Sequence, residues 1–334
     1  MTHRRFWAIL VDVRIVINGW FRDRLTTGSG QYLAALNEWL PRVGDEHEFV
    51  AVQPAGPRAT QSGAAPGVEW TTAPTPFDHV SENLAKLWFE QVSFPAACRR
   101  LRAAVAFVPY WAAPWWSPCP VVVTVHDLIP LLLPAYRGGA LQRGYTWLVG
   151  RTARRAAAVL ADSEASRQDV IRHLHIAAGR VHAVHLAADA RFQPGADAAT
   201  LRRVRERYAL PDGPFLLYLG GFDARKNLAR TLEAYARLVQ RLAAEARDAP
   251  RLVIAGKLPA TDSAFAPDPR PIIARLALTE HVHLPGWVDE ADKPALYALA
   301  AGALFVSEYE GFGLPVLEAM AAEPRSDAGP MPGE

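Results

Sequence analysis

The chain of 334 residues is long enough for two domains of ordinary size. Its hydrophobic content of 50% and charged content of 21% are typical of a soluble globular protein, and a net charge of +2 argues against a dedicated nucleic-acid-binding protein. Two cysteines, Cys98 and Cys119, are too few for a disulfide framework and lack a metal-ligand spacing, so a reducing cytoplasm is expected. No apolar run is long enough for a signal peptide or a membrane span.

Strand and helix patterns alternate through the first part of the chain. Strands are predicted at residues 8–13, 49–52, 105–108, 121–125, 158–161 and 181–186, and helices at 31–40, 88–100 and 141–158. Residues 54–76 are rich in Pro, Gly, Ala and Thr and are predicted to form a loop. This order predicts a doubly wound α/β domain over residues 1–194.

A glycine-rich loop, Gly28-Ser29-Gly30, follows the first predicted strand and opens the first helix. A dinucleotide-binding loop is one interpretation of such a segment, but the loop is long and its third glycine is missing. The sequence therefore does not favour a dinucleotide site here.

His126 is the first candidate for chemistry, because it follows the β-branched run Val121–Val125. Such a run is typical of a central parallel strand, and open α/β sheets bind ligands at the carboxyl ends of their strands. A satisfied core histidine is the alternative interpretation.

Two further features of this part each have two interpretations. An aromatic run (Tyr110, Trp111, Trp115 and Trp116) either packs in the core or lines an acceptor site. Arginines are dense in the helix predicted over 141–158, and they either contact an anionic lipid carrier or lie on a solvated face. Packing in the core is favoured for the aromatic run, and a solvated face is favoured for the arginines.

A second α/β domain is predicted over residues 200–322, after a Gly/Pro/Ala-rich linker near 194–199. Its predicted strands are 215–219, 251–256, 281–284 and 303–306, and its predicted helices are 228–242, 272–278, 292–301 and one that begins near Pro315. The tail, residues 323–334, is polar and proline-rich and is predicted to be disordered.

The loop after the strand 215–219 has the composition of a diphosphate site. Gly220 and Gly221 leave the backbone open, and Arg225 and Lys226 lie just before a helix. Backbone amides, a helix dipole and two cations would converge there. A solvated loop with helix-flanking charges is the alternative.

The segment that organises the chain runs from Phe305 to Met320: a strand, a glycine loop and a helix N-terminus. Such a junction favours oxygen-rich ligands. Glu310 and Glu318 bracket it, eight positions apart. Because carboxylates are repelled by a diphosphate, they are expected to accept hydrogen bonds from sugar and ribose hydroxyls. An ordinary strand-to-helix connection is the alternative interpretation.

With Gly311-Phe312-Gly313-Leu314-Pro315 between the two glutamates, this segment resembles the signature of retaining glycosyltransferases of GT-B architecture, family 4. The resemblance extends to Gly28–Tyr32, Thr124–Leu128 and Gly220–Asn227, and covers the chain to about residue 322. It implies two Rossmann-like domains facing a cleft, the second of them incomplete. It departs at Gly221, where relatives often have an arginine, so the cations of the diphosphate site are expected to be Arg225 and Lys226 alone.

The resemblance also assigns roles to residues. His126 is expected to contact the donor sugar, Glu310 and the following loop amides (Gly311, Phe312, Gly313 and Leu314) to hold it, and Glu318 to hold the ribose. Gly220, Gly221, Arg225 and Lys226 would bind the diphosphate, and Gly28, Ser29 and Gly30 would border the donor phosphates and the acceptor.

The expected function is retaining, metal-independent transfer of a hexose from a nucleotide-diphosphate sugar, with guanosine-diphosphate mannose as the first candidate. The acceptor would be a saccharide or a lipid-linked hydroxyl, and no cofactor, metal or nucleic acid is expected. A cytoplasmic protein is predicted, with peripheral contact at the inner face of the membrane left open. The resemblance implies that elements which follow in the family are missing from this chain, so a truncated remnant that at most binds nucleotide is one alternative. Another GT-B enzyme, such as a sugar-nucleotide epimerase or a phosphorylase, is the other.

Overall fold

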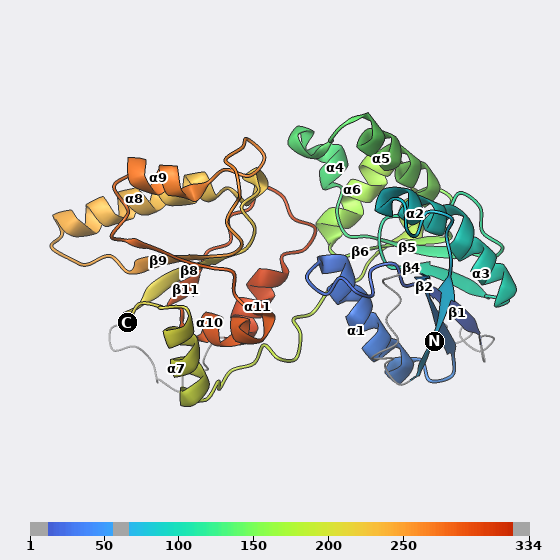
Figure 1. Ribbon diagram of the computed structural model, residues 1–334, viewed down its shortest axis with the longest axis horizontal. Helices are drawn as coiled ribbons and strands as arrows, with labels where there is room; N and C mark the ends of the chain where they lie inside the picture. Colours follow the sequence, from blue (N-terminus) through green and yellow to red (C-terminus); the bar gives the residue numbers. More distant parts are fainter. Residues whose placement is uncertain (1–12, 56–66, 323–334) are drawn as a thin grey trace, which may run out of the picture. The chain divides into compact units, whose positions relative to one another are not determined.

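The computed structural model describes residues 13–55 and 67–322 of the chain (Figure 1). The chain folds as two compact units that divide between His185 and Leu186, and each unit is described by itself. The strand predicted at 8–13 and the tail 323–334 lie, apart from residue 13, outside the described residues. In the part of the chain that is described, no helix is both long and apolar enough to cross a membrane.

The first unit contains a seven-stranded sheet, in which every pairing is parallel and the strand order is β3-β2-β1-β4-β5-β6-β7. The strands are β1 (Arg14–Asn18), β2 (Glu48–Pro54), β3 (Val68–Ala73), β4 (Val105–Val108), β5 (Val121–Val125), β6 (Ala158–Ala161) and β7 (Val181–Ala183). The order reverses between β1 and β4, as in a doubly wound fold.

Helices cover both faces of this sheet. They are α1 (Gly28–Val43), α2 (Glu82–Trp88), α3 (Phe94–Arg100), α4 (Ile129–Leu132), α5 (Ala140–Ala153) and α6 (Glu164–Leu174). Because successive strand residues point to opposite faces, neighbours on β1 join different cores. Ile17 packs with Leu33 of α1, whereas Val16 belongs to the cluster that contains Phe89, Phe94 and helices α5 and α6.

Several predictions for this unit are wrong. Strand β1 forms at Arg14–Asn18, where no strand was predicted, and the helix predicted over 141–158 ends at Ala153. The loop predicted over 54–76 contains β3, whose residues 68–73 are mainly β-branched and aromatic between turn-forming neighbours. The single helix predicted over 88–100 is α2 and α3 joined by a π-helical turn, Phe89–Ser93. The wider turn rotates the side chains, so Phe89 is buried whereas Trp88 and Val92 are exposed.

The second unit has a four-stranded parallel sheet of order β10-β9-β8-β11. Its strands are β8 (Phe215–Leu219), β9 (Arg251–Ala255), β10 (Val282–Gly286) and the short β11 (Gly302–Ala303). Its helices are α7 (Ala198–Arg207), α8 (Leu228–Ala244), α9 (Pro269–Arg275), α10 (Lys293–Leu299) and α11 (Leu314–Ala322). One core joins the sheet to α7 and α10, and another joins it to α8 and α9.

The division between the units falls before the linker predicted at 194–199. The segment that follows Leu186 groups with the second unit because Phe192 is buried in its core and stacks edge-on against Tyr297 of α10. The strand predicted over 303–306 is shorter than expected: only Gly302 and Ala303 pair with β8.

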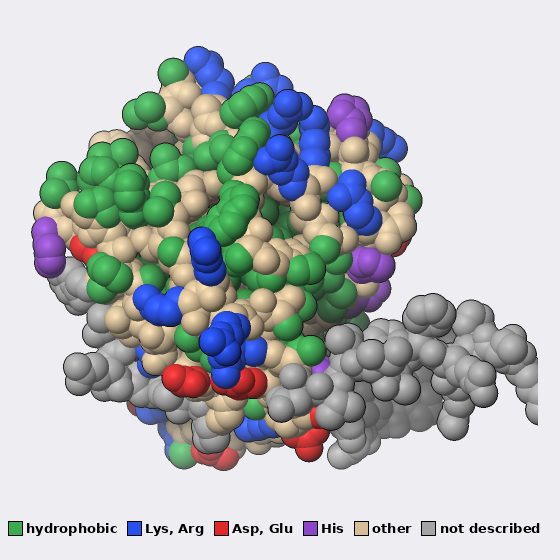
Figure 2. Space-filling model, turned by 90° about the vertical axis from the view of Figure 1, so that its right-hand side faces the viewer, with side chains coloured by type: hydrophobic (Ala, Val, Ile, Leu, Met, Phe, Trp, Pro, Cys, Tyr) green, Lys and Arg blue, Asp and Glu red, His purple; other side chains and the backbone are tan. Residues whose placement is uncertain are grey.

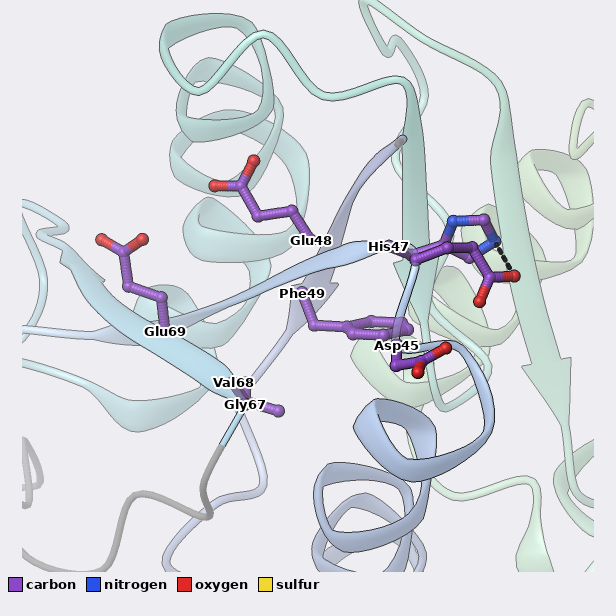
Figure 3. Close-up of a pocket in the computed structure, with 8 residues that line it drawn as sticks. Asp45, His47, Glu48, Phe49, Gly67, Val68 and Glu69 are labelled. Carbon is purple, nitrogen blue, oxygen red and sulfur yellow. Dashed lines mark ion pairs between the residues drawn. The ribbon is translucent and has the colours of Figure 1, made fainter. Parts of the chain in front are cut away.

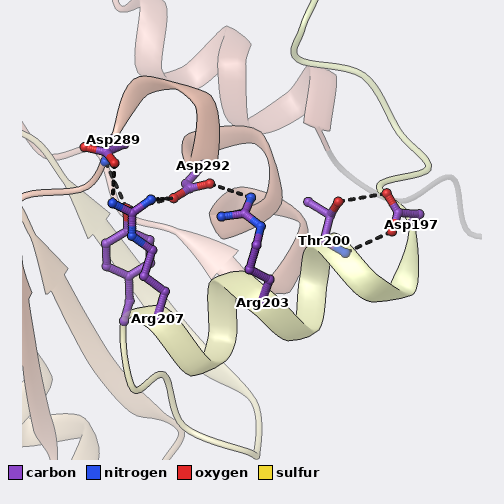
Figure 4. Close-up of polar contacts among 7 residues, drawn as sticks. Asp197, Thr200, Arg203, Arg207, Asp289 and Asp292 are labelled. Carbon is purple, nitrogen blue, oxygen red and sulfur yellow. Dashed lines mark hydrogen bonds and ion pairs between the residues drawn. The ribbon is translucent and has the colours of Figure 1, made fainter.

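Asp292, at the start of α10, connects that helix to α7 (Figure 4). Its carboxylate is 2.7 Å from Arg203 and 2.8 Å from Arg207, and the hydroxyl of Tyr208 donates to it at 2.9 Å. The side chain is almost fully buried. Burial raises the pKa of Asp292, but the hydrogen bonds from Arg203 and Tyr208 and the two positive charges lower it further, so the net shift is downward.

Replacing Asp292 with alanine is expected to lower the free energy of unfolding of the second unit by about 3 kcal/mol, because two arginines and a buried hydroxyl lose their common acceptor. A lowered pKa stabilises the fold above the ordinary pKa range of aspartate, and this stabilisation is lost as the pH falls through the folded-state pKa. Urea unfolding of both proteins at pH 7 and pH 3 should therefore show a smaller difference at pH 3. The exposed Asp212→Ala is the control, and an equal difference at both pH values would contradict the expectation.

Candidate active site

His126 directly follows β5, and Asp162 directly follows the neighbouring strand β6. The register pairs Val125 with Ala161, so the next residue of each strand lies beside the other at the carboxyl edge of the sheet. The Nδ1 atom of His126 is 2.8 Å from Oδ2 of Asp162, and Nε2 is 3.2 Å from the carbonyl oxygen of Pro109, which follows β4. Both ring nitrogens thus face acceptors, an arrangement that a doubly protonated imidazolium satisfies.

The direction of the pKa shift of His126 follows from the same contacts. Burial lowers its pKa, but the hydrogen bond to Asp162, the charge of Asp162 and the Pro109 carbonyl together raise it above the ordinary value. His126 is a candidate from the sequence, whereas Asp162 is not among the sequence-predicted site residues. Its position after the strand next to β5 is the signal that could have identified it.

The predicted glycine loop lies at the beginning of α1, on the same unit as His126. The hydroxyl of Thr27 accepts from the amide of Gly30, which caps the helix, and α1 begins at Gly28 rather than at the predicted residue 31. A Cβ atom on Gly30 would lie 2.0 Å from the carbonyl oxygen of Arg24, so close packing requires glycine there. Further along α1, the ring of Tyr32 packs edge-on against His126, with centroids 4.9 Å apart.

The second group of candidates lies in the second unit, after β8. Gly220 continues the strand by donating its amide to the carbonyl of Ala255. The adjacent turn requires glycine at 256, because its φ is +153° and a Cβ atom would lie 2.2 Å from the carbonyl oxygen of Gly220. Arg225 and Lys226 follow on a 3₁₀ turn, Ala224–Lys226, immediately before α8.

Glu310 joins Arg225 and Lys226, although 84 positions separate it from Lys226 in the sequence. Its two oxygens are each 2.6 Å from a cation, one from Nη1 of Arg225 and the other from Nζ of Lys226. The backbone is tied at the same place, because the amide of Glu308 donates to the carbonyl of Arg225 and Arg225 donates to the carbonyl of Tyr309. Burial raises the pKa of Glu310, but the hydrogen bond and charge of Lys226, with Ser307 and Arg225, lower it overall.

The glycine loop after Glu310 ends at α11, which begins at Leu314. Gly313 has a φ of +109°, and its carbonyl accepts from the amide of Val316 in the first turn of the helix. Glu318 lies one turn further along and is half-buried; the hydroxyl of Tyr297 donates to it at 3.4 Å. Burial is the largest cause of the raised pKa of Glu318. Sequence reasoning missed Tyr297 because α10 and α11 meet only in the folded unit.

The sequence therefore selected two groups of residues, each assembled within one unit. His126 lies beside the glycine-loop helix in the first unit. Gly220, Gly221, Arg225, Lys226 and the loop Glu310–Leu314 meet in the second unit, where Glu318 follows on α11. Among the described residues, no three His, Cys, Asp or Glu side chains are placed to hold a metal ion. Metal independence stays a prediction.

A cavity of about 470 Å³ lies at another place in the first unit (Figure 3). Its lining includes Glu48 and Val68, the first residues of β2 and β3, together with Asp45, Glu46 and Glu69. This is the amino edge of the sheet, opposite to the carboxyl edge at which open α/β sheets bind ligands. Its acidic side chains would also repel a phosphate, so the cavity is not part of the candidate site.

Two α/β units, each with a parallel sheet and polar residues at the carboxyl ends of its strands, are the features of the GT-B fold. Solved structures of glycosyltransferases align with this chain. Sucrose-phosphate synthase from Thermosynechococcus elongatus aligns with a TM-score of 0.69 at 18% identity, over 93% of this chain and 80% of that one. HepE of Anabaena in complex with UDP aligns with a TM-score of 0.60 at 16% identity, over 93% and 78%. The predicted fold class is confirmed.

Residues 26–192 match the model of Glycosyltransferase Family 4, and residues 202–323 match that of Glycosyl transferases group 1. The chain belongs to this glycosyltransferase family. O-antigen chain mannosyltransferase B of Escherichia coli is 30% identical over 60% of this chain and 50% of that protein, and alpha-D-kanosaminyltransferase of Streptomyces kanamyceticus is 32% identical over 52% and 42%. The chain thus matches about half the length of these curated relatives.

Proposed function

We propose that the protein transfers a hexose from a nucleotide-diphosphate sugar to a hydroxyl of a saccharide or lipid-linked acceptor, with retention of configuration and without a metal ion. The grouping of Arg225, Lys226 and Glu310 at the loop before α11 carries this proposal. Guanosine-diphosphate mannose is the first candidate donor, since three kinds of matched relative are mannosyltransferases by name. One of them is the serotype-specific mannosyltransferase WbdA of Escherichia coli, at 32% identity over 64% of this chain.

The proposed reaction depends mainly on stabilisation of the leaving group, the nucleoside diphosphate. Negative charge builds on the β-phosphate as the glycosidic bond breaks, and Arg225 and Lys226 are held in fixed positions that can accept it. Glu310 would exchange these cations for sugar hydroxyls when the donor binds. The half-buried Glu318 would accept hydrogen bonds from the ribose, and His126 would contact the donor sugar.

Nucleotide binding and sugar transfer test the proposal separately. Calorimetric titration with guanosine, uridine and thymidine diphosphates is expected to show micromolar binding of one of them, and Glu318→Ala is expected to weaken it roughly tenfold through the loss of one or two hydrogen bonds to the ribose. The exposed Glu280→Ala is the matched control. Incubation with the corresponding sugar nucleotide in EDTA, followed by product analysis, should give a glycoside of retained configuration. Binding without any product indicates a nucleotide-binding remnant, and a new sugar nucleotide indicates an epimerase.

A further inference from the structure

The first unit carries a strong local excess of positive charge. Residues 91–161 contain eight arginines and one acidic residue, Asp127, within a chain whose formal net charge is only +2. In the described part of the chain, Arg143, Arg151 and Arg155 make no ion pair with an acidic side chain. If these arginines served only to stabilise the fold, we would expect them to form ion pairs with acidic side chains. Their positive charge is therefore available to an anionic partner.

Helix α5 presents this charge together with a large apolar side chain. Arg143, Trp147 and Arg151 follow one another at intervals of four residues and therefore lie along one face of the helix. Trp147 is 61% exposed, and the guanidinium of Arg151 lies 5.9 Å from the centre of its ring. Leu141, at the beginning of the helix, is 93% exposed. Leaving these large apolar side chains exposed to water is unfavourable.

A neighbouring loop continues the same surface. Arg155, just after α5, stacks on Trp115 at 4.3 Å and donates to its carbonyl at 3.1 Å, and Trp116 is itself exposed. The amide of Trp115 donates to Gln91 of the π-helical turn, where Val92 is also exposed. These contacts connect α5, the loop 115–116 and the turn after α2 into one surface, which we call the Arg/Trp surface.

Figure 2 shows one face of the molecule, on which blue side chains lie among green ones in the upper part, while red ones lie mainly lower down. Charge of one sign mixed with exposed apolar groups distinguishes a lipid partner from an acidic protein or a nucleic acid. Tryptophan and arginine are the residues that place a polar or charged end at the headgroups and an apolar body in the acyl boundary.

We propose that the Arg/Trp surface, formed by Arg143, Trp147, Arg151, Arg155, Trp115 and Trp116, docks the first unit on a membrane rich in anionic phospholipid. Arginines contact the headgroup phosphates, and the indole rings and Leu141 enter the interface. This docking is independent of the transfer reaction proposed above, because none of these residues belongs to the candidate active site. It would bring the enzyme to the surface where a lipid-linked acceptor resides.

Co-sedimentation of the full chain with vesicles tests this proposal. Binding is expected to phosphatidylcholine vesicles that contain 30 mol% phosphatidylglycerol, to be much weaker for phosphatidylcholine alone, and to fall as sodium chloride is raised from about 50 to 500 mM, where the Debye length shortens. Two variants separate the two parts of the surface. Arg143→Glu with Arg151→Glu, and Trp116→Ser with Trp147→Ser, should each lower the partition coefficient by roughly tenfold or more.

The controls change the same residue types elsewhere. Arg237→Glu with Arg241→Glu on α8, and Trp287→Ser, replace exposed residues of the second unit and should leave vesicle binding unchanged. Circular dichroism and thermal unfolding establish that each variant is folded. Equal binding to both vesicle types, no binding at all, or equal loss in the control variants would overturn the proposal. So would binding to a 20-nucleotide oligonucleotide that displaces the vesicles and is insensitive to the tryptophan substitutions, because the surface would then serve a nucleic acid.

Discussion

Replacing Lys226 with alanine is expected to reduce sugar transfer by roughly 10² to 10³ in kcat, the usual effect of removing one preorganised donor from a developing negative charge. The ammonium group is largely buried and has a fixed position, 2.6 Å from Glu310 and 5.6 Å from the centre of the Phe305 ring. It therefore needs little reorganisation to meet a phosphate oxygen. Initial rates with saturating sugar nucleotide measure the effect, with the exposed Arg237→Ala of α8 as the matched control.

The variant Glu310→Gln tests the same group of residues through the binding of a nucleoside diphosphate. In the wild type, the carboxylate of Glu310 pairs with both Arg225 and Lys226, so it competes with a diphosphate for the same two cations. Removing the negative charge is expected to tighten binding of a bare nucleoside diphosphate by roughly three- to tenfold, while transfer falls because the sugar hydroxyls lose an acceptor. Weaker binding of the nucleoside diphosphate by a folded Glu310→Gln protein would show that these cations do not hold the diphosphate.

Buried parallel strands were the most predictable part of the fold. The runs at 105–108, 121–125, 158–161 and 215–219 match β4, β5, β6 and β8, because a strand covered on both faces is a continuous apolar run. The strand β3 was missed because its surroundings are rich in turn formers, and half of its residues are polar or exposed. The division of one predicted helix at the π-helical turn also has no simple sequence signal.

The site could be predicted only as separate motifs. Spacing identified Arg225 with Lys226, and Glu310 with Glu318, each as a local pattern. It could not show that Glu310 pairs with both cations, because that contact depends on how β8 and the loop after β11 lie side by side. Repulsion between carboxylates and a diphosphate led to the expectation of hydroxyl contacts for Glu310. The ion pairs add a competing partner that a linear pattern does not reveal.

The contact between His126 and Asp162 makes a prediction about pH. The raised pKa of His126 means that the folded state binds its proton more tightly than the unfolded state does. The resulting stabilisation is fully present below the unfolded-state pKa of histidine, about 6.5, and is lost as the pH rises through the higher folded-state pKa. Wild type should therefore exceed His126→Gln in unfolding free energy by roughly 1 to 3 kcal/mol at pH 6, and by less at pH 9.

A matched pair elsewhere in the unit provides the control. His173 lies 4.0 Å from Asp169 on α6, and both side chains are partly exposed. Ion pairs that are long and solvent-accessible contribute little, so His173→Gln should change the unfolding free energy only slightly at either pH. Asp162→Asn should remove the pH dependence of the His126 contribution, because the neutral amide no longer holds the imidazolium. If His126 also contacts the donor, His126→Ala lowers kcat by roughly 10², and Asp162→Asn shifts the alkaline limb of the rate profile to lower pH. A rate profile unchanged by Asp162→Asn would confine the pair to a structural role, since loss of a proton from His126 would then have no effect on transfer.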